Sequence, residues 1–198
     1  MRKKRIRFLL LGILIIASLI IIEEQDKIRQ ITYIATLGKH SIPEQYYPIY
    51  KKAAEEFDIP WELLASVHRV ETVFSTMDPL ISPVGAVGHF QFMPRTWIGW
   101  THPGSDLGTI DEDVDLTDIL LIETHNGYGL DASGNGKADP FDVTDSAFAA
   151  AKYLADHGAK QGDYKKALFA YNQSDEYVNE VLLYYESYLE HYELIDLR

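Results

Sequence analysis

Glu71 is the side chain in this sequence whose setting best suits acid–base chemistry. It follows a mainly apolar run, residues 63–70, and the spacing predicts a helix over 61–72. Shortly afterwards, residues 82–94 bring together glycine, glutamine and methionine. A carboxyl that ends an apolar helix and faces a glycine-rich turn suits a general acid, because burial raises its pKa and keeps it protonated near neutral pH. The plain alternative is a helix-terminal glutamate in a surface ion pair.

Three sequence blocks occur in a fixed order around this glutamate. They are Glu71 itself, the segment 82–94, which reads Ser-Pro-Val-Gly-Ala-Val-Gly-His-Phe-Gln-Phe-Met-Pro, and the later triplet Ala170, Tyr171 and Asn172. In this order they resemble the signature of soluble lytic transglycosylases and goose-type lysozymes. That signature has a helix-terminal Glu, then Ser-x-x-Gly-Ala-x-Gly-x-x-Gln-x-Met-Pro, then Ala-Tyr-Asn. Three ordered blocks are far more specific than one short motif.

The resemblance extends over roughly residues 43 to 190 and implies an all-α, lysozyme-like catalytic domain. Residues 128–142 look most like the branch of membrane-bound lytic murein transglycosylase B and the related Gram-positive cell-wall lysozyme-like domains. Helical spacing independently predicts helices over residues 44–57, 61–72, 90–100, 116–122, a helix ending at 154 behind a cap at Asp142 or Thr144, 164–171 and 175–189. No run alternates as a strand would, and room is left only for a small hairpin near the cleft.

The chemistry implied by the resemblance is cleavage of the β-1,4 bond between MurNAc and GlcNAc in peptidoglycan. Glycosidic cleavage needs an acid for the leaving oxygen and a group that stabilises the cation-like transition state. No second acid stands at a compelling place, although Asp78 and the acids within 111–123 are near in sequence. A 2-acetamido group on the substrate can stabilise the cation instead, so one carboxyl suffices.

This one-carboxyl pattern favours a lytic transglycosylase. In the resembled family the glutamate acts first as acid and then as base on the C6 hydroxyl, which gives a 1,6-anhydro product without water. The alternative is a hydrolytic muramidase, in which a water attacks instead. A remoter alternative is a cell-wall module that binds glycan without turnover.

Five further residues are expected to shape the substrate subsites, because the resembled family uses the matching positions. They are Ser82, Gln91, Met93, Tyr171 and Asn172. Most have a plain structural alternative. Ser82 could cap its own loop, Met93 and Tyr171 could pack in the core, and Asn172 could end a helix.

A second constellation has the spacing of a calcium-binding loop. Gly136 stands at the sixth loop position, and the ligand positions hold Asp131, Ser133, Asn135, Lys137, Asp139 and Asp142. This pattern predicts a structural calcium ion, with no cofactor required for catalysis. The alternative is an Asn-Gly turn with helix caps and no ion.

The N-terminus has the pattern of a membrane segment. Five basic residues within positions 1–7 precede an uncharged apolar run over 8–22. The pattern divides the chain into a signal-anchor at 1–22, a stalk or spacer at 23–42 and a catalytic domain at 43–198. The basic prefix predicts a single-pass protein of the cell membrane with an extracytoplasmic domain. Secretion after signal cleavage is the alternative, and the absence of cysteine fits either export route.

The charge of the chain limits its partners. Five of its 18 basic residues lie within positions 1–7, so the rest of the chain is strongly acidic against 30 Asp and Glu. Nucleic acid is excluded as a partner because its binding requires a basic footprint. An acidic domain remains compatible with glycan strands of peptidoglycan, held by stacking and hydrogen bonds.

Overall fold

The computed structural model describes residues 35, 37–111 and 113–196. The predicted anchor at 1–22 and most of the predicted spacer at 23–42 lie outside these residues. Among the residues described, no helix has the length and apolar character needed to cross a membrane. The unit Lys39–Arg198 is compact and is described here by itself.

Helices dominate the described part of the chain, as the sequence pattern predicts. It contains seven α-helices, two 3-10 turns and two short strands: β1 (Ser41–Pro43), η1 (Glu44–Tyr46), α2 (Tyr47–Phe57), α3 (Trp61–Thr72), α4 (Pro94–Ile98), α5 (Ile119–His125), α6 (Val143–Asp156), η2 (Ala159–Gln161), α7 (Tyr164–Tyr171), α8 (Asp175–Glu190) and β2 (Glu193–Ile195). The main departure is α4, which was predicted over 90–100 but begins only at Pro94. It starts late because Gln91 adopts a left-handed conformation and Phe92 pairs with Val87 in an isolated antiparallel bridge.

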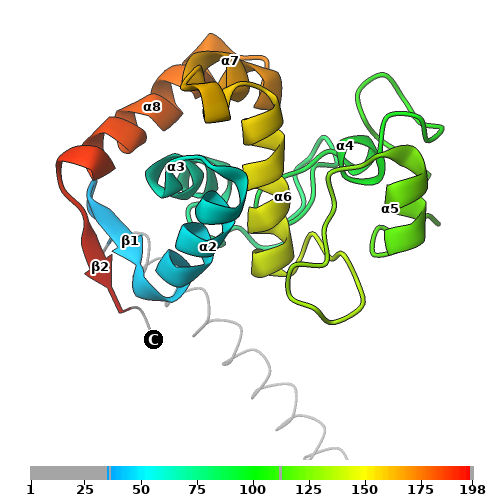
Figure 1. The fold of residues 1–198 in the computed structure, drawn as a ribbon, viewed down its shortest axis with the longest axis horizontal. Helices are drawn as coiled ribbons and strands as arrows, with labels where there is room; N and C mark the ends of the chain where they lie inside the picture. The colour runs from blue at the N-terminus through cyan, green and yellow to red at the C-terminus, as the bar shows by residue number, and fades with distance from the viewer. Residues whose placement is uncertain (1–34, 36, 112, 197–198) are drawn as a thin grey trace, which may run out of the picture. The chain divides into compact units, whose positions relative to one another are not determined.

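Helix α3 forms the centre of the unit. Its apolar residues are buried along almost its whole length, including Leu63, Leu64 and Val67. It packs against α2, α6 and α8, and Figure 1 shows α2, α6, α7 and α8 arranged around it. Because the helix itself is buried, a polar side chain near its end is placed in apolar surroundings, where its charged form is unfavourable.

Side-chain caps fix where the outer helices begin. Asp142 accepts hydrogen bonds from the backbone N–H groups of Thr144 and Asp145, so it caps α6. Asp163 caps α7 and Ser174 caps α8 in the same manner. Each cap satisfies N–H groups that have no partner within the helix.

The two strands correct the prediction that no strand is present. β1 and β2 form a parallel pair in which Ser41 lies opposite Glu193 and Pro43 opposite Ile195. All three residues of β1 are buried, so the segment lacks the alternation by which a strand is recognised. The small hairpin expected near the cleft appears as two isolated bridges, Ile81 to Val87 and Val87 to Phe92.

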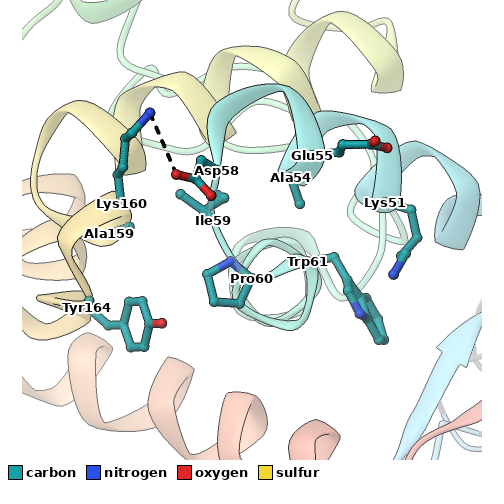
Figure 2. A pocket seen from close by; sticks show the side chains of 11 residues that line it. Lys51, Ala54, Glu55, Asp58, Ile59, Pro60, Trp61, Ala159, Lys160 and Tyr164 are labelled. Carbon is teal, nitrogen blue, oxygen red and sulfur yellow. Dashed lines mark ion pairs between the residues drawn. The ribbon is translucent and has the colours of Figure 1, made fainter.

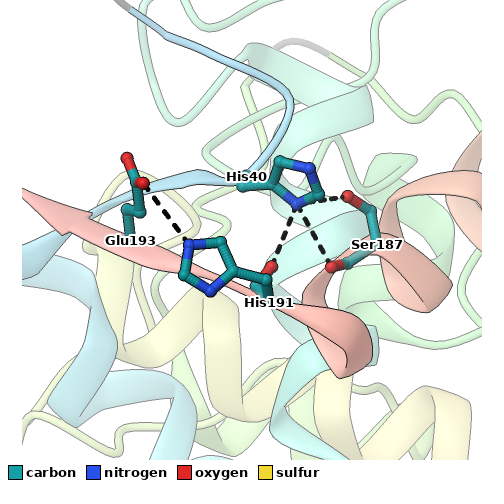
Figure 3. Close-up of polar contacts among 4 residues, drawn as sticks. All are labelled: His40, Ser187, His191 and Glu193. Atoms are coloured by element: carbon teal, nitrogen blue, oxygen red, sulfur yellow. Dashed lines mark hydrogen bonds and ion pairs between the residues drawn. The ribbon is translucent and has the colours of Figure 1, made fainter.

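A histidine fastens this strand pair to the end of α8. The Nδ1 atom of His40 lies 2.9 Å from the Ser187 hydroxyl and 3.0 Å from the His191 carbonyl oxygen (Figure 3). His191 in turn lies 3.4 Å from the Glu193 carboxylate. The first and last segments of the unit are thereby joined.

Candidate active site

Glu71 lies in the last turn of α3, and its side chain is partly buried. Burial raises its pKa from 4.5 to about 8, while the neighbouring Tyr177 hydroxyl opposes the rise. The carboxyl is therefore largely protonated at neutral pH. That is the state which a general acid requires before it acts.

Two tyrosines from the C-terminal helices accompany this carboxyl. Tyr171 ends α7 and Tyr177 lies in the first turns of α8, and their rings stack with centroids 6.4 Å apart. Burial raises the pKa of both hydroxyls well above the usual value, and the nearby Glu71 raises them further. Neither phenol ionises near neutral pH, so both act as neutral hydrogen-bonding groups.

The Tyr177 hydroxyl is fully enclosed. It makes no hydrogen bond of good geometry within the described part of the chain, although it lies close enough to Glu71 to lower the pKa of that carboxyl. Buried polar groups almost always find a partner. Among the described residues, the Tyr177 hydroxyl is thus a buried polar group beside Glu71 without a partner of good geometry.

A cleft of about 340 Å³ lies beside these residues. It brings together three of the predicted subsite residues, Gln91, Met93 and Tyr171. Glu71 is not itself part of this lining. Tyr171, which lines the cleft, is the residue that relates the two, because the charge of Glu71 helps to raise the pKa of its hydroxyl.

The loop that carries Gln91 and Met93 is held by close backbone contacts. Gly88 has a φ of +79°, and a Cβ there would lie 1.9 Å from the Pro140 carbonyl oxygen, so only glycine fits. The Gln91 amide nitrogen donates to the Gly88 carbonyl at 2.8 Å. The Tyr171 hydroxyl donates to the Phe90 carbonyl at 2.7 Å, which ties the same loop to α7.

Two predicted subsite residues have local structural roles. The Ser82 hydroxyl accepts a hydrogen bond from the Ala86 N–H at 3.0 Å, so it closes its own loop, and no bond to Glu71 is found among the described contacts. Asn172 is exposed at the end of α7 and does not line the cleft. Its neighbour Gln173 does line the cleft.

A further rim of the cleft is formed by Trp100, Asp106 and Leu107. Sequence reasoning missed Asp106 and Leu107, whereas Trp100, which is 50% exposed, is one of the aromatic side chains that the sequence offers for stacking on a sugar. Arg95 organises this rim, because its guanidinium donates to the Trp100 and Ser105 carbonyls at 2.9 and 3.0 Å and also lies over the Trp100 ring. The only sequence signal was a tryptophan near a glycine-containing loop, and that does not specify which face of the fold the loop covers.

The loop with calcium-like spacing is closed by hydrogen bonds from its own backbone. The Asp131 carboxylate accepts hydrogen bonds from the backbone N–H groups of Gly134, Asn135 and Gly136, while Asp142 caps α6. No group of three acidic or histidine side chains converges among the described residues as a metal site would need. The carboxylates of this loop are thus engaged with backbone N–H groups. Calcium binding by the loop stays a prediction.

Asp145, which sequence reasoning missed, fastens this loop instead. It is fully buried, and its two carboxylate oxygens accept hydrogen bonds from the Ser133 and Asp139 N–H groups at 2.7 and 3.0 Å. Burial raises the pKa of Asp145, while these two bonds lower it. A helix position three residues after a cap is a weak sequence signal for such a role.

A second cavity, of about 580 Å³, lies at the other end of α3. Trp61 and Lys51 line one side of it, and an ion pair of 3.7 Å joins Lys160 to Asp58 across the opposite edge (Figure 2). Trp61 and Glu71 are ten positions apart on α3, which corresponds to roughly 15 Å along a helix. This cavity contains none of the predicted site residues.

No protein-family model, curated protein or solved structure matches this chain. The chemistry of the site therefore has to be argued from its own residues. They combine a largely protonated carboxylic acid with a cleft of amide, thioether and aromatic groups.

Proposed function

We propose that this protein is a peptidoglycan-cleaving enzyme of the lysozyme-like class. It cuts the β-1,4 bond between MurNAc and GlcNAc, and lytic transglycosylation is the reaction that its residues support best. One observation carries the proposal: burial raises the pKa of Glu71 to about 8 beside the cleft that Gln91, Met93 and Tyr171 line.

The proposed reaction uses Glu71 twice. The protonated carboxyl donates its proton to the glycosidic oxygen as the C1–O bond breaks, and the 2-acetamido group of the substrate stabilises the developing cation. The resulting carboxylate then accepts the proton of the C6 hydroxyl while that oxygen bonds to C1. The products are a new 4-hydroxyl end and a 1,6-anhydro-MurNAc end, and no water is consumed.

The cleft walls fit a neutral polysaccharide. Gln91 and Gln173 offer amides suited to hydroxyl and acetamido groups, and the half-exposed Trp100 ring offers an apolar face on which a sugar can stack. The low number of basic residues outside positions 1–7 disfavours polyanionic ligands such as nucleic acid. These features support glycan strands as the substrate.

A hydrolytic muramidase is the second candidate, and Asp106 favours it. This carboxyl lines the same cleft, on the rim that Arg95 organises. Hydrolysis with one acid needs a second group that directs a water to C1, and a carboxylate performs that role in many glycosidases. A non-catalytic glycan-binding module is less well supported, because glycan binding alone does not require a carboxyl with a raised pKa.

We further propose the cell membrane as the location, with the catalytic domain on the extracytoplasmic side. The basic residues before the apolar run over 8–22 support this orientation. Secretion after cleavage of that segment is the alternative.

Product analysis tests the reaction class. The full chain would be incubated with purified peptidoglycan, and the soluble muropeptides would be weighed by mass spectrometry before and after borohydride reduction. The proposal predicts non-reducible 1,6-anhydro ends. Reducible ends, heavier by one water, would establish the muramidase, and then Asp106→Asn should abolish turnover. The absence of any soluble product would contradict both enzymatic candidates.

A further inference from the structure

A continuous chain of hydrogen bonds runs behind the candidate active site. The Tyr50 hydroxyl lies 2.6 Å from Nδ1 of His68, and Nε2 of that ring lies 2.8 Å from the Ser75 hydroxyl. The Ser75 hydroxyl lies 2.6 Å from Nδ1 of His89, and Nε2 of His89 lies 2.9 Å from the Phe141 carbonyl oxygen. The chain thus joins α2, α3, the turn after α3, the cleft loop and the loop before α6.

The far end of the chain fixes the position of every proton in it. A carbonyl oxygen can only accept, so His89 must carry its proton on Nε2. In a neutral ring Nδ1 is then an acceptor, which obliges the Ser75 hydroxyl to donate to it and to accept from Nε2 of His68. His68 Nδ1 is an acceptor in turn, and Tyr50 donates to it. All four bonds therefore point in one direction.

Both imidazoles are held neutral, as this arrangement requires. His68 is completely buried and stacks on Phe90 with ring centroids 4.6 Å apart. Burial lowers the pKa of His68 well below its usual value, and His89 lowers it further. Burial also lowers the pKa of His89, against the opposing effects of Phe141, Asp142 and Asp139.

The backbone of His89, as well as its ring, forms hydrogen bonds with neighbouring segments. Its N–H donates to the Pro140 carbonyl at 3.2 Å, and its own carbonyl accepts from the Thr72 hydroxyl at 2.9 Å. Thr72 directly follows Glu71, and Gln91 stands two positions after His89. One residue therefore spans from the end of the helix that holds the acid to the loop that lines the cleft.

The turn after α3 has an unusual backbone that serves this link. Val73, Phe74 and Ser75 all adopt left-handed conformations, with φ between +49° and +67°. Such conformations are unfavourable for residues other than glycine and persist only where surrounding contacts hold them. Here they bring the Ser75 hydroxyl between the two imidazoles.

We propose that His89 is a positioning residue that, through its one-directional chain to Ser75, His68 and Tyr50, holds the cleft loop bearing Gln91 and Met93 in register with Glu71. The link to catalysis rests on the proposed function. The positions of the protons on His68 and His89 and the ordering of the cleft loop do not depend on it. Three measurements therefore separate a failure of this inference from a failure of the proposed function.

The first measurement reads the protons directly. Long-range ¹⁵N–¹H correlation spectra of the full chain at neutral pH should show both His68 and His89 as neutral Nε2–H tautomers. Ser75→Ala should leave His89 as the Nε2–H tautomer, which the Phe141 carbonyl fixes, and should convert His68 to a mixture of tautomers, because Nε2 of His68 loses its acceptor while the Tyr50 hydroxyl can either donate or accept. An Nδ1–H tautomer or a charged ring at either position in the wild type would overturn the proposal.

The second measurement compares His89→Leu with His89→Gln, which keeps one donor and one acceptor. If His89 positions the loop, the leucine variant should raise KM for soluble glycan strands about tenfold with kcat changed much less, and glutamine should recover part of that loss. A residue that only stabilises the fold would lower Tm in both variants and leave KM unchanged well below Tm. An unchanged KM in both variants would overturn the proposal.

Should the wild type prove inactive on glycan, the loop itself is still observable. The NMR chemical shifts of the backbone amides over residues 88–93 should change in His89→Leu. They should be unchanged in Lys160→Ala, an exposed control in the second cavity. Shifts confined to the two immediate neighbours of position 89 would show that His89 does not order the loop.

Discussion

At the scale of single residues, the site depends on one carboxyl that the fold holds out of water. Glu71 closes a helix whose neighbours are almost all buried, so its ionised form is penalised. The nearby Tyr177 hydroxyl offsets part of that penalty, because it lowers the pKa of Glu71. The same arrangement that suits acid catalysis must therefore reduce the stability of the folded protein at higher pH.

This cost predicts a pH-dependent effect of Glu71→Gln on stability. The pKa of Glu71 is raised from its ordinary value of 4.5 to about 8 in the folded protein, so its contribution to stability is fully present below pH 4.5 and is lost as the pH rises to 8. Glutamine does not ionise. At pH 9 the variant should be more stable than the wild type by up to about 5 kcal/mol, and near pH 4 the two should be similar.

Urea unfolding followed by circular dichroism at pH 4, 7 and 9 would measure the difference. Glu62→Gln, in the first turn of the same helix, is the matched control and should show no comparable trend. A difference between Glu71→Gln and the wild type that stays constant across this range would contradict the burial argument.

At the scale of elements, two loops are each held by a single bridging or buried side chain. Arg95 organises the rim that carries Trp100, and Asp145 organises the loop over residues 131–142. Asp131 and Asp139, two of the predicted calcium ligands in that loop, accept backbone N–H groups. The order of the loop is thus accounted for by protein groups alone.

Asp145→Ala tests this account of the loop. The change leaves the Ser133 and Asp139 N–H groups without their acceptor, so the free energy of unfolding should fall by about 2–4 kcal/mol. Asp111→Ala, at an exposed position, should change it by less than about 0.5 kcal/mol. Chemical denaturation at pH 7 gives both values, and equal small effects would show that Asp145 does not hold the loop.

At the scale of the whole molecule, the mainly helical fold was predictable because apolar residues recur at helical spacing in α2, α3, α6 and α8. The strand pair was not, because β1 is buried throughout and its partner lies at the other end of the domain. The late start of α4 depends on the left-handed Gln91, and a left-handed conformation is uncommon for any residue but glycine.

Some residues of the candidate site could likewise be predicted from the sequence, and others could not. Gln91, Met93 and Tyr171 could be grouped with Glu71 from ordered motifs, and the structure brings these three to one cleft. Asp106 and the chain through His68 and His89 could not be foreseen, because each depends on which distant segments the fold brings together. Sequence periodicity specifies faces of elements, whereas contacts between loops follow only from the assembled structure.

The central claim is that Glu71 is the acid of a peptidoglycan-cleaving enzyme. The most direct test measures the release of soluble muropeptides from purified peptidoglycan by the wild type, Glu71→Gln and Glu62→Gln at equal concentrations. We expect Glu71→Gln to fold normally and to lose at least about 1,000-fold in rate, while Glu62→Gln stays within about threefold of the wild type. Muropeptide release by Glu71→Gln at a rate close to that of the wild type would contradict the account.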